Sequence, residues 1–236
     1  MNIIIKIFFL LRNFFFPSFC CLCETSLIYA EEIKYGLCGK CRLSLVPFGG
    51  TNCNKCGKPL ISEIDTCLPC RNSVHSYDRM WPLFPYTGKY RKLLTSYKFK
   101  KRLSLVYFFS EKISEVFDSN PCFNDAVIVP VPPRPGKVKD TGWDQVDFLV
   151  RNLKKANGRL PVSHCLKRRV SKAQKSLNRK DRLENLKDRI YVKGTVPQTA
   201  LIIDDVITTG STMEICANTL KAAGAKTVYG LCLFYD

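Results

Sequence analysis

The sequence predicts an α/β protein in which helices flank a parallel sheet, with a small cysteine-rich region in front of it. Residues 125–132 (DAVIVPVP) and 199–206 (TALIIDDV) are runs of apolar, often β-branched residues, as in strands that are buried on both faces. Apolar residues at helical spacing follow at residues 143–157 and 212–223. This alternation of strands and helices is typical of parallel sheets covered by helices on both sides.

The remaining elements fit around these four. Residues 77–118 begin with short extended pieces, interrupted by Pro82 and Pro85, and continue with two helices. Residues 162–166 (VSHCL) are a candidate short strand, and residues 227–234 (TVYGLCLF) form the last strand. The sequence therefore divides into three parts: an amphipathic helix over residues 1–19, the cysteine-rich region over residues 20–72, and the α/β domain over residues 77–236.

The N-terminal segment, MNIIIKIFFLLRNFFFP, is apolar but is interrupted by Lys6, Arg12 and Asn13. A membrane span needs about 20 mostly apolar residues, and no small-residue cleavage site of an export signal follows. We therefore expect an amphipathic helix that packs on the body of the protein, with contact to lipid as the alternative. Without an export signal, the expected location is the cytoplasm, where thiols stay reduced.

The charge of the chain points to a polyanionic partner. Lys and Arg number 37 against 20 Asp and Glu, which leaves a net charge of +17 and a pI near 9.4. This excess favours nucleic acid, a phosphorylated substrate or anionic lipid over a merely solvated basic surface. Phe99 lies among basic residues, a mixture that suits stacking on single-stranded DNA. The residues singled out for nucleic-acid contact are Lys98, Lys100, Lys101, Arg102, Arg168 and Arg169.

Nine of the thirteen cysteines fall within residues 20–70, and eight of these form four Cys-x-x-Cys pairs. Two such pairs deliver four thiolates to a tetrahedral zinc, so four pairs predict two structural zinc sites. An iron–sulfur cluster is the alternative metal, and interleaved pairing of the knuckles stays open. Disulfides are disfavoured in a reducing compartment. The simplest grouping is a first tetrad of Cys20, Cys23, Cys38 and Cys41 and a second tetrad of Cys53, Cys56, Cys67 and Cys70.

Two adjacent carboxylates end the strand over residues 199–206, namely Asp204 and Asp205. A hydroxyl-rich loop and a helix N-terminus follow, an arrangement that attracts a phosphate group. The carboxylates are placed to bind ribose hydroxyls or a hydrated Mg²⁺. Neither the G-x-x-x-x-G-K-[ST] nor the G-x-G-x-x-G pattern occurs here. The hydroxyl-rich loop consists of Thr208, Thr209, Gly210, Ser211 and Thr212.

LIIDDVITTGST closely resembles the signature of type I phosphoribosyltransferases, which bind 5-phosphoribosyl 1-pyrophosphate with Mg²⁺. The resemblance implies that Asp204 and Asp205 meet the ribose 2- and 3-hydroxyls and that the hydroxyl-rich loop holds the 5-phosphate. Together with the four cysteine pairs, the chain resembles the ComF family of bacterial DNA-uptake proteins over nearly its whole length. This family resemblance implies a type I phosphoribosyltransferase-like parallel sheet flanked by helices, preceded by a small double zinc ribbon. Further matches are YKFKKR near residue 98, VIVPVPPRP after residue 126, and Ser171, Gln174, Leu177, Arg182 and Asn185.

The resemblance also implies partners and a role. The expected partners are phosphoribosyl pyrophosphate, single-stranded DNA and a DNA-uptake helicase or ATPase, and the expected role is DNA uptake in natural transformation. If the protein is a catalyst, Asp204 and Asp205 would act with Mg²⁺, and Lys98, Arg134 and Arg168 would offset the charge of the leaving pyrophosphate. The alternative reading is therefore an active phosphoribosyltransferase with an unknown nitrogenous acceptor.

One motif departs from the family pattern. Relatives of this kind usually carry Arg-Gly-Phe-Asn-Gln, where this chain has Thr-Gly-Trp-Asp-Gln at residues 141–145. Losing a cation and gaining a carboxylate beside a polyanion site is expected to weaken phosphate binding locally.

Overall fold

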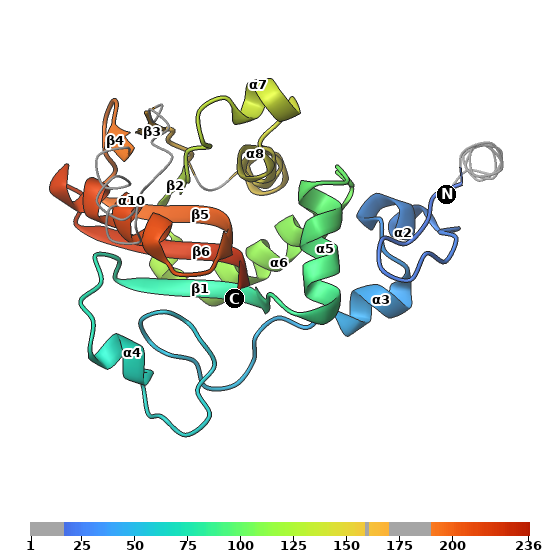
Figure 1. Ribbon diagram of the computed structural model, residues 1–236, viewed down its shortest axis with the longest axis horizontal. Coiled ribbons are helices and arrows are strands. Elements are labelled where there is room, and N and C mark those ends of the chain that lie inside the picture. The colour runs from blue at the N-terminus through green and yellow to red at the C-terminus, as the bar shows by residue number, and fades with distance from the viewer. Residues whose placement is uncertain (1–16, 159–160, 170–189) are drawn as a thin grey trace, which may run out of the picture.

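The computed structural model describes residues 17–158, 161–169 and 190–236 (Figure 1). The predicted N-terminal helix lies outside them except for residues 17–19, which are not helical. Within the described ranges, no helix is long and apolar enough to cross a membrane. The helices are α2 (Ala30–Tyr35), α3 (Gly39–Ser44), α4 (Leu68–Arg71), α5 (Gly88–Lys98), α6 (Leu105–Ser119), η1 (Pro121–Phe123), α7 (Lys137–Thr141), α8 (Gln145–Asn157) and α10 (Ser211–Ala222). The strands are β1 (Arg79–Pro85), β2 (Val127–Pro130), β3 (Leu166–Arg168), β4 (Ile190–Val192), β5 (Thr199–Ile207) and β6 (Thr227–Tyr235).

A parallel four-stranded sheet forms the centre of the protein, in the order β1-β6-β5-β2. In the register of the sheet, Ile202 on β5 lies opposite Val129 on β2 and Gly230 on β6. Because all four strands run the same way, their carboxyl ends meet at one edge of the sheet. The end of β5, which carries the predicted acid pair, lies at this edge.

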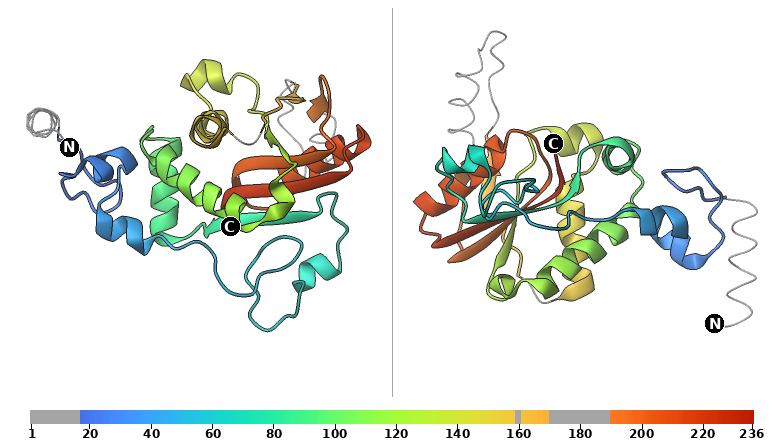
Figure 2. Two further views of the ribbon diagram at one scale, coloured as in Figure 1. Left: turned by 180° about the vertical axis from the view of Figure 1, so that it is seen from behind. Right: turned by 90° about the horizontal axis from the view of Figure 1, so that it is seen from below.

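Helices cover both faces of the sheet, as the buried strand sequences predict (Figures 1 and 2). Leu201 and Ile203 point into a core that includes buried residues of α5, α6 and α8. Ala200 and Ile202 point to the opposite face, into a core that includes buried residues of α10. This confirms the predicted fold class, an α/β protein with a parallel sheet flanked by helices. Full burial of each large apolar side chain contributes roughly 1.5–3 kcal/mol.

Two strand predictions were wrong. Pro82 and Pro85 do not interrupt the extended segment, since both belong to β1, where Pro82 lies opposite Cys232. β1 is an edge strand with a single neighbour, and a proline without an N–H is tolerated there. At the other edge, Val162 makes only a lone bridge to Ile128, and the strand that begins at Leu166, β3, pairs instead with β4 in a separate two-stranded antiparallel sheet.

The first tetrad packs beside α5 and α6 (Figure 1). Tyr90 on α5 donates a hydrogen bond from its hydroxyl to the Val46 carbonyl oxygen at 3.0 Å. Lys92, also on α5, donates to the Leu22 carbonyl oxygen at 2.6 Å. Leu27, Leu37 and Leu45 are buried in the same core as the helices. This region is therefore joined to the body through α5.

The second tetrad packs elsewhere, against the outer edge of the sheet at β1 (Figure 2). Met80 on β1 donates its backbone N–H to the Lys55 carbonyl oxygen at 2.8 Å. Gly57 has φ +71°, and a Cβ on it would lie 2.2 Å from Cδ of Pro82 and 2.5 Å from the Met80 carbonyl oxygen. Only glycine fits this approach. The second tetrad is thus part of the core on the α10 face, although the boundaries at residues 20–72 and 77–236 stay a prediction.

We therefore expect loss of zinc at the second tetrad to destabilise the sheet as well as the cysteine-rich region. Cys56→Ser should lower the melting temperature of the whole chain, whereas Cys23→Ser, in the more exposed first tetrad, should lower it less. A loss of about 3 kcal/mol corresponds to about 6–12 °C at this chain length. Far-UV circular dichroism melts of both variants measure the difference. An unchanged main transition in Cys56→Ser would show that the sheet does not depend on this tetrad.

Candidate functional site

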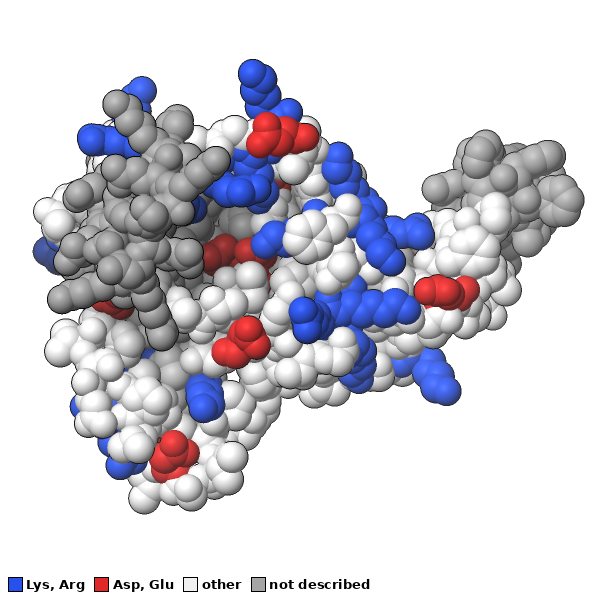
Figure 3. Space-filling model, in the orientation of Figure 1, with Lys and Arg blue, Asp and Glu red and all other residues white. Residues whose placement is uncertain are grey.

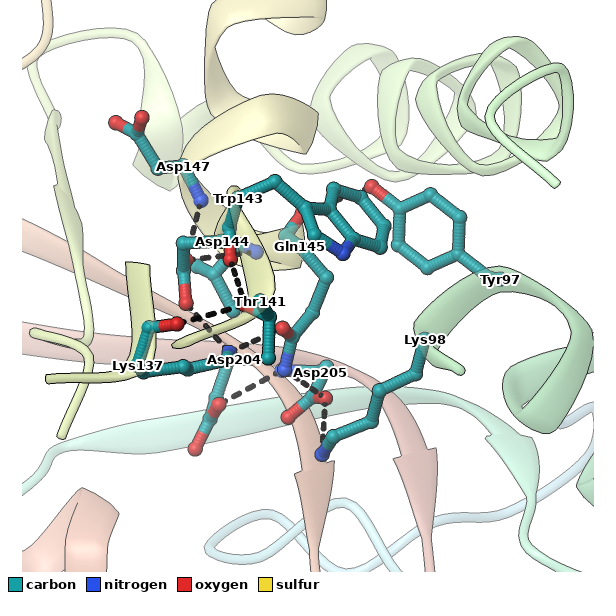
Figure 4. Close-up of polar contacts among 11 residues, drawn as sticks. Tyr97, Lys98, Lys137, Thr141, Trp143, Asp144, Gln145, Asp147, Asp204 and Asp205 are labelled. Carbon is teal, nitrogen blue, oxygen red and sulfur yellow. Dashed lines mark hydrogen bonds and ion pairs between the residues drawn. The ribbon is translucent and has the colours of Figure 1, made fainter. Parts of the chain in front are cut away.

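The acid pair lies near the carboxyl end of β5, and both side chains are buried, with Asp204 9% and Asp205 5% exposed. The two carboxyl groups lie close together, and the Asp205 backbone N–H donates a hydrogen bond to Asp204 Oδ1 at 2.8 Å. Lys98 Nζ lies 2.7 Å from Asp205 Oδ2, and Gln145 Nε2 donates a hydrogen bond to the same oxygen at 2.6 Å. Lys98 is the last residue of α5 and Gln145 the first of α8, so three elements converge on one carboxylate (Figure 4).

The two carboxyls differ in charge state because their surroundings differ. Burial raises the pKa of Asp204 well above its ordinary value, and the negative charge of Asp205 raises it further. Burial also acts to raise the pKa of Asp205, but the charge and hydrogen bond of Lys98 and the Gln145 amide outweigh it and lower that pKa. The free protein therefore holds one ionised and one protonation-prone carboxyl side by side.

Residues 143–145 are held in place by α5. Tyr97 donates a hydrogen bond from its buried hydroxyl to the Gln145 carbonyl oxygen at 2.8 Å. The Tyr97 and Trp143 rings meet edge to face, with centroids 5.4 Å apart. These contacts fix the start of α8 and therefore the position of the Gln145 side chain beside Asp205.

Asp144, the carboxylate gained in the departing motif, is the N-cap of α8. Its Oδ1 accepts hydrogen bonds from the backbone N–H groups of Val146 at 3.0 Å and Asp147 at 2.9 Å. Lys137 Nζ lies 2.6 Å from Oδ2. The helix dipole and the Lys137 cation both offset the charge of this carboxylate. Little of the negative charge of Asp144 is therefore left to repel an anion. The weakening of phosphate binding expected from the sequence is correspondingly smaller.

A cavity of about 470 Å³, the acid-pair cavity, opens over the carboxyl edge of the sheet. Figure 3 shows Lys and Arg side chains gathered on this side of the molecule, from α7 past the end of α5 toward the first tetrad. Such a rim of cations around buried carboxylates suits an anionic ligand that also carries hydroxyl groups or a divalent cation. The predicted site residues that line the cavity are Lys98, Arg134, Arg168, Asp204, Asp205 and Thr212.

The hydroxyl-rich loop connects β5 to α10. Gly210 has φ +72° and is the N-cap of α10, a left-handed conformation that favours glycine. The hydroxyls of Thr209 and Ser211 lie 2.9 Å apart, and Thr208 and Thr209 are exposed. Thr209, Gly210 and Ser211 line a separate cavity of about 260 Å³, the loop cavity, on the side of the second tetrad. The loop therefore borders both cavities, with Thr212 lining the acid-pair cavity.

The eight paired cysteines form two groups, and the grouping is the consecutive one. Within each tetrad all four sulfurs lie within 4.8 Å of one another. The Sγ atoms of Cys23 and Cys38 are 3.6 Å apart, and those of Cys56 and Cys67 are 3.7 Å apart. Zn–S bonds of about 2.3 Å in a tetrahedron give sulfur separations of about 3.8 Å, so the donor sets fit zinc.

The comparisons with known proteins agree with these observations. A family model described as a double zinc ribbon domain matches residues 11–74. Competence protein ComFC of Streptococcus pneumoniae is 30% identical over 207 residues, which cover 86% of this chain and 90% of the relative. The chain belongs to the ComF family. Together with the two tetrads, the family model supports two structural zinc sites in this ComF protein.

Other relatives of this ComF protein match along most of their length. Competence protein F of Haemophilus influenzae is 26% identical over 223 residues, 91% of this chain and 95% of the relative. The DNA utilization protein YhgH of Escherichia coli K12 is 26% identical over 229 residues, which cover 92% of this chain and 96% of the relative. Among solved structures, a purine phosphoribosyltransferase from Pyrococcus horikoshii matches 56% of this chain and 80% of that chain, with 16% identity and a TM-score of 0.31.

The other predicted residues of the ComF protein are more dispersed. Lys100, Lys101 and Arg102 follow α5 on the surface, and Lys101 Nζ donates to the Thr141 carbonyl oxygen at 2.8 Å. Arg169 lies over the Tyr191 ring, 4.9 Å from its centroid. The family-pattern residues Ser171, Gln174, Leu177, Arg182 and Asn185 lie outside the described residues.

Sequence reasoning missed three residues that the structure adds to the site. Gln145 lies in the departing motif at residues 141–145. Because the family pattern also has a glutamine there, that match could have identified Gln145 as a site residue. Lys137 and His75 stand in no motif considered above. They reach the site only through the packing of α7 and of the chain that follows the second tetrad.

The opposite pKa directions predict opposite stability effects in this ComF protein. The folded state keeps a proton on Asp204 at pH values where the unfolded chain has already released it. Asp204 therefore contributes stability at low pH, and this contribution is lost as the pH rises from about 4 through the raised pKa. Asp204→Asn removes this loss, so it should raise the melting temperature at pH 7–8 and change it little near pH 4.

Asp205→Asn is the matched control. Because the pKa of Asp205 is lowered, its carboxylate stabilises the folded protein above about pH 4, and this stabilisation is lost as the pH falls below that. It should lower the melting temperature at pH 7–8. Each 1 kcal/mol corresponds to about 2–4 °C, and thermal melts across pH 4–8 measure both shifts. The same sign for both variants at neutral pH would contradict the assignment.

Proposed function

We propose that this ComF protein binds phosphoribosyl pyrophosphate with Mg²⁺ in the acid-pair cavity, binds single-stranded DNA on the adjoining basic surface, and acts in DNA uptake during natural transformation. The observation that carries the proposal is the buried Asp204–Asp205 pair between a rim of cations and a hydroxyl-rich loop. Relatives along most of the chain are named competence or DNA utilization proteins, which supports the role. Thiolate zinc sites suit a cytoplasmic location.

The residues present fit a ribose phosphate with a divalent cation. Carboxylate oxygens are the ligands that Mg²⁺ prefers, and ribose hydroxyls donate well to ionised carboxylates. Bound Mg²⁺ would neutralise charge on the pyrophosphate oxygens. Lys98 would hold Asp205 ionised, and Arg134 and Arg168 line the same cavity, where they would offset the remaining ligand charge. Asp204 would give up its proton when cation and ligand arrive.

The DNA surface would begin at the mouth of the same cavity. Phe99 lines that cavity and is 71% exposed. Its backbone N–H donates to the Thr95 carbonyl oxygen at 3.0 Å, which fixes the turn that presents the ring. The exposed cations Lys100, Lys101 and Arg102 follow at once. An exposed aromatic ring among cations suits base stacking along a single strand.

A second candidate function, transfer of the phosphoribosyl group to a nitrogenous acceptor, is favoured by a neighbouring cavity of about 380 Å³. It shares Val131, Asp144 and Arg168 with the acid-pair cavity. His164 Nε2 lies 3.0 Å from Asp147 Oδ1 on its wall, and such a pair would accept a proton from an attacking nitrogen.

Calorimetric titration with phosphoribosyl pyrophosphate and Mg²⁺ tests the pocket. Asp205→Asn should weaken binding about ten-fold or more, because a contact to an ionised group is worth about 1.5–3 kcal/mol. Asp125→Asn, an exposed carboxylate before β2 at the opposite end of the sheet, is the matched control and should bind as the wild type does. Equal affinities for both variants would rule out the acid pair as the ligand site.

The DNA surface is tested by the salt dependence of binding to an oligothymidylate. The slope of log K against log salt is about −0.7 for each phosphate contact with a single strand. Lys100→Ala/Arg102→Ala should therefore flatten the slope by about 1.4, and Lys154→Ala/Lys155→Ala at the end of α8 is the control with the same change in charge. Identical slopes for the two double variants would place the DNA elsewhere.

A further inference from the structure

The chain that leaves the second tetrad crosses the start of α10 before it enters β1. The backbone N–H of Ser76 donates to Glu214 Oε1 at 2.8 Å, and Glu214 belongs to the first turn of α10. His75 Nδ1 lies 3.5 Å from the other oxygen, Oε2, which is within ion-pair distance but long for a hydrogen bond. A segment from the cysteine-rich region therefore rests on the helix that follows the hydroxyl-rich loop.

His75 and Glu214 form one wall of the loop cavity, and Thr209, Gly210 and Ser211 form another. His75 Nε2 and Glu214 Oε2 are buried atoms without a hydrogen-bond partner among the described residues. An unsatisfied buried polar atom costs about 1–3 kcal/mol, so such atoms mark places where a ligand or water completes the structure. Two of them belong to residues that line the cavity beside the loop that is predicted to hold a phosphate.

The charged side chains that line the loop cavity determine whether it can bind an anion. Glu214 alone would disfavour an anion on the loop, because two negative charges would meet at short range. His75 lies beside that carboxylate and is the residue lining the cavity that can carry a positive charge. A carboxylate at Nδ1 orients an imidazole so that Nε2–H is presented to a second partner.

We propose that His75 is a ligand of the 5-phosphate on the hydroxyl-rich loop, oriented by Glu214 and positioned by the second zinc site. This inference rests on the proposed function and adds to it a binding residue from the cysteine-rich region. With the imidazole turned so that Nε2 opens into the loop cavity, Nε2–H of His75 donates to a phosphate oxygen, while the loop supplies its backbone N–H groups and hydroxyls.

The segment that carries His75 is anchored at both ends. Before it stands Cys70 of the second tetrad, and after it Asp78, whose Oδ2 accepts from the Val228 backbone N–H at 2.7 Å. Tyr77 is buried with Cys53, Cys56 and Cys67, and its ring stacks on His75 with centroids 4.8 Å apart. The position of the imidazole therefore depends on the second tetrad.

The test compares two probes by calorimetry: ribose 5-phosphate, which carries the 5-phosphate, and pyrophosphate with Mg²⁺, which does not. His75→Ala should weaken ribose 5-phosphate binding about ten-fold or more and leave pyrophosphate binding unchanged. His75→Gln should restore most of the affinity, because its amide N–H reaches about as far as Nε2. Ser73→Ala, at an exposed position in the same segment that does not line the loop cavity, is the matched control and should bind both probes as the wild type does.

Zinc content and melting temperature show whether each variant is folded and fully loaded. With both unchanged, wild-type affinity of His75→Ala for ribose 5-phosphate would overturn the proposal, and so would an equal loss of both probes. Failure of the wild type to bind either probe, together with no binding of phosphoribosyl pyrophosphate, would instead refute the proposed function itself.

Discussion

The arrangement of the site depends on one interaction, the contact of a buried carboxylate, Asp205, with Lys98 and Gln145. A lone buried carboxylate would be neutralised, because removing its charge from water is costly. The Lys98 cation and the amide keep it ionised, and its charge then raises the pKa of Asp204 beside it. This one contact thus ties α5 and α8 to β5 and sets two different charge states on adjacent residues.

The same contact explains how distant parts of the chain cooperate. α5 carries Lys98 at its end and holds the first tetrad along its side, so the zinc region and the acid pair share a scaffold. The second tetrad reaches the site by another route, through the edge strand β1 and the segment around His75. The two cysteine tetrads thereby gain separate places in the core, the first with α5 and α6 and the second with β1 and α10.

Local patterns carried the sequence predictions that were confirmed. The buried strand at residues 199–206 is a continuous apolar run, and the cysteine grouping follows from spacing within short loops. The predictions that were wrong or missing depended on contacts between remote segments. Pro82 is accepted within β1 only because that strand lies at the edge, and His75 approaches the hydroxyl-rich loop only because the second tetrad docks on β1. Neither fact is visible in the residues next to them.

The proposed ligand site depends on the unequal charge states of the acid pair and on their change when the ligand binds. Carbon-13 NMR of labelled aspartate side chains, with the resonances assigned through Asp204→Asn and Asp205→Asn, measures both pKa values directly. In the free protein, Asp204 should titrate above the ordinary value of 3.8 and Asp205 below it. With phosphoribosyl pyrophosphate and Mg²⁺ bound, both should be ionised at neutral pH. Titration of Asp204 at or below 3.8, or spectra of the pair unchanged by the ligand, would contradict these charge states.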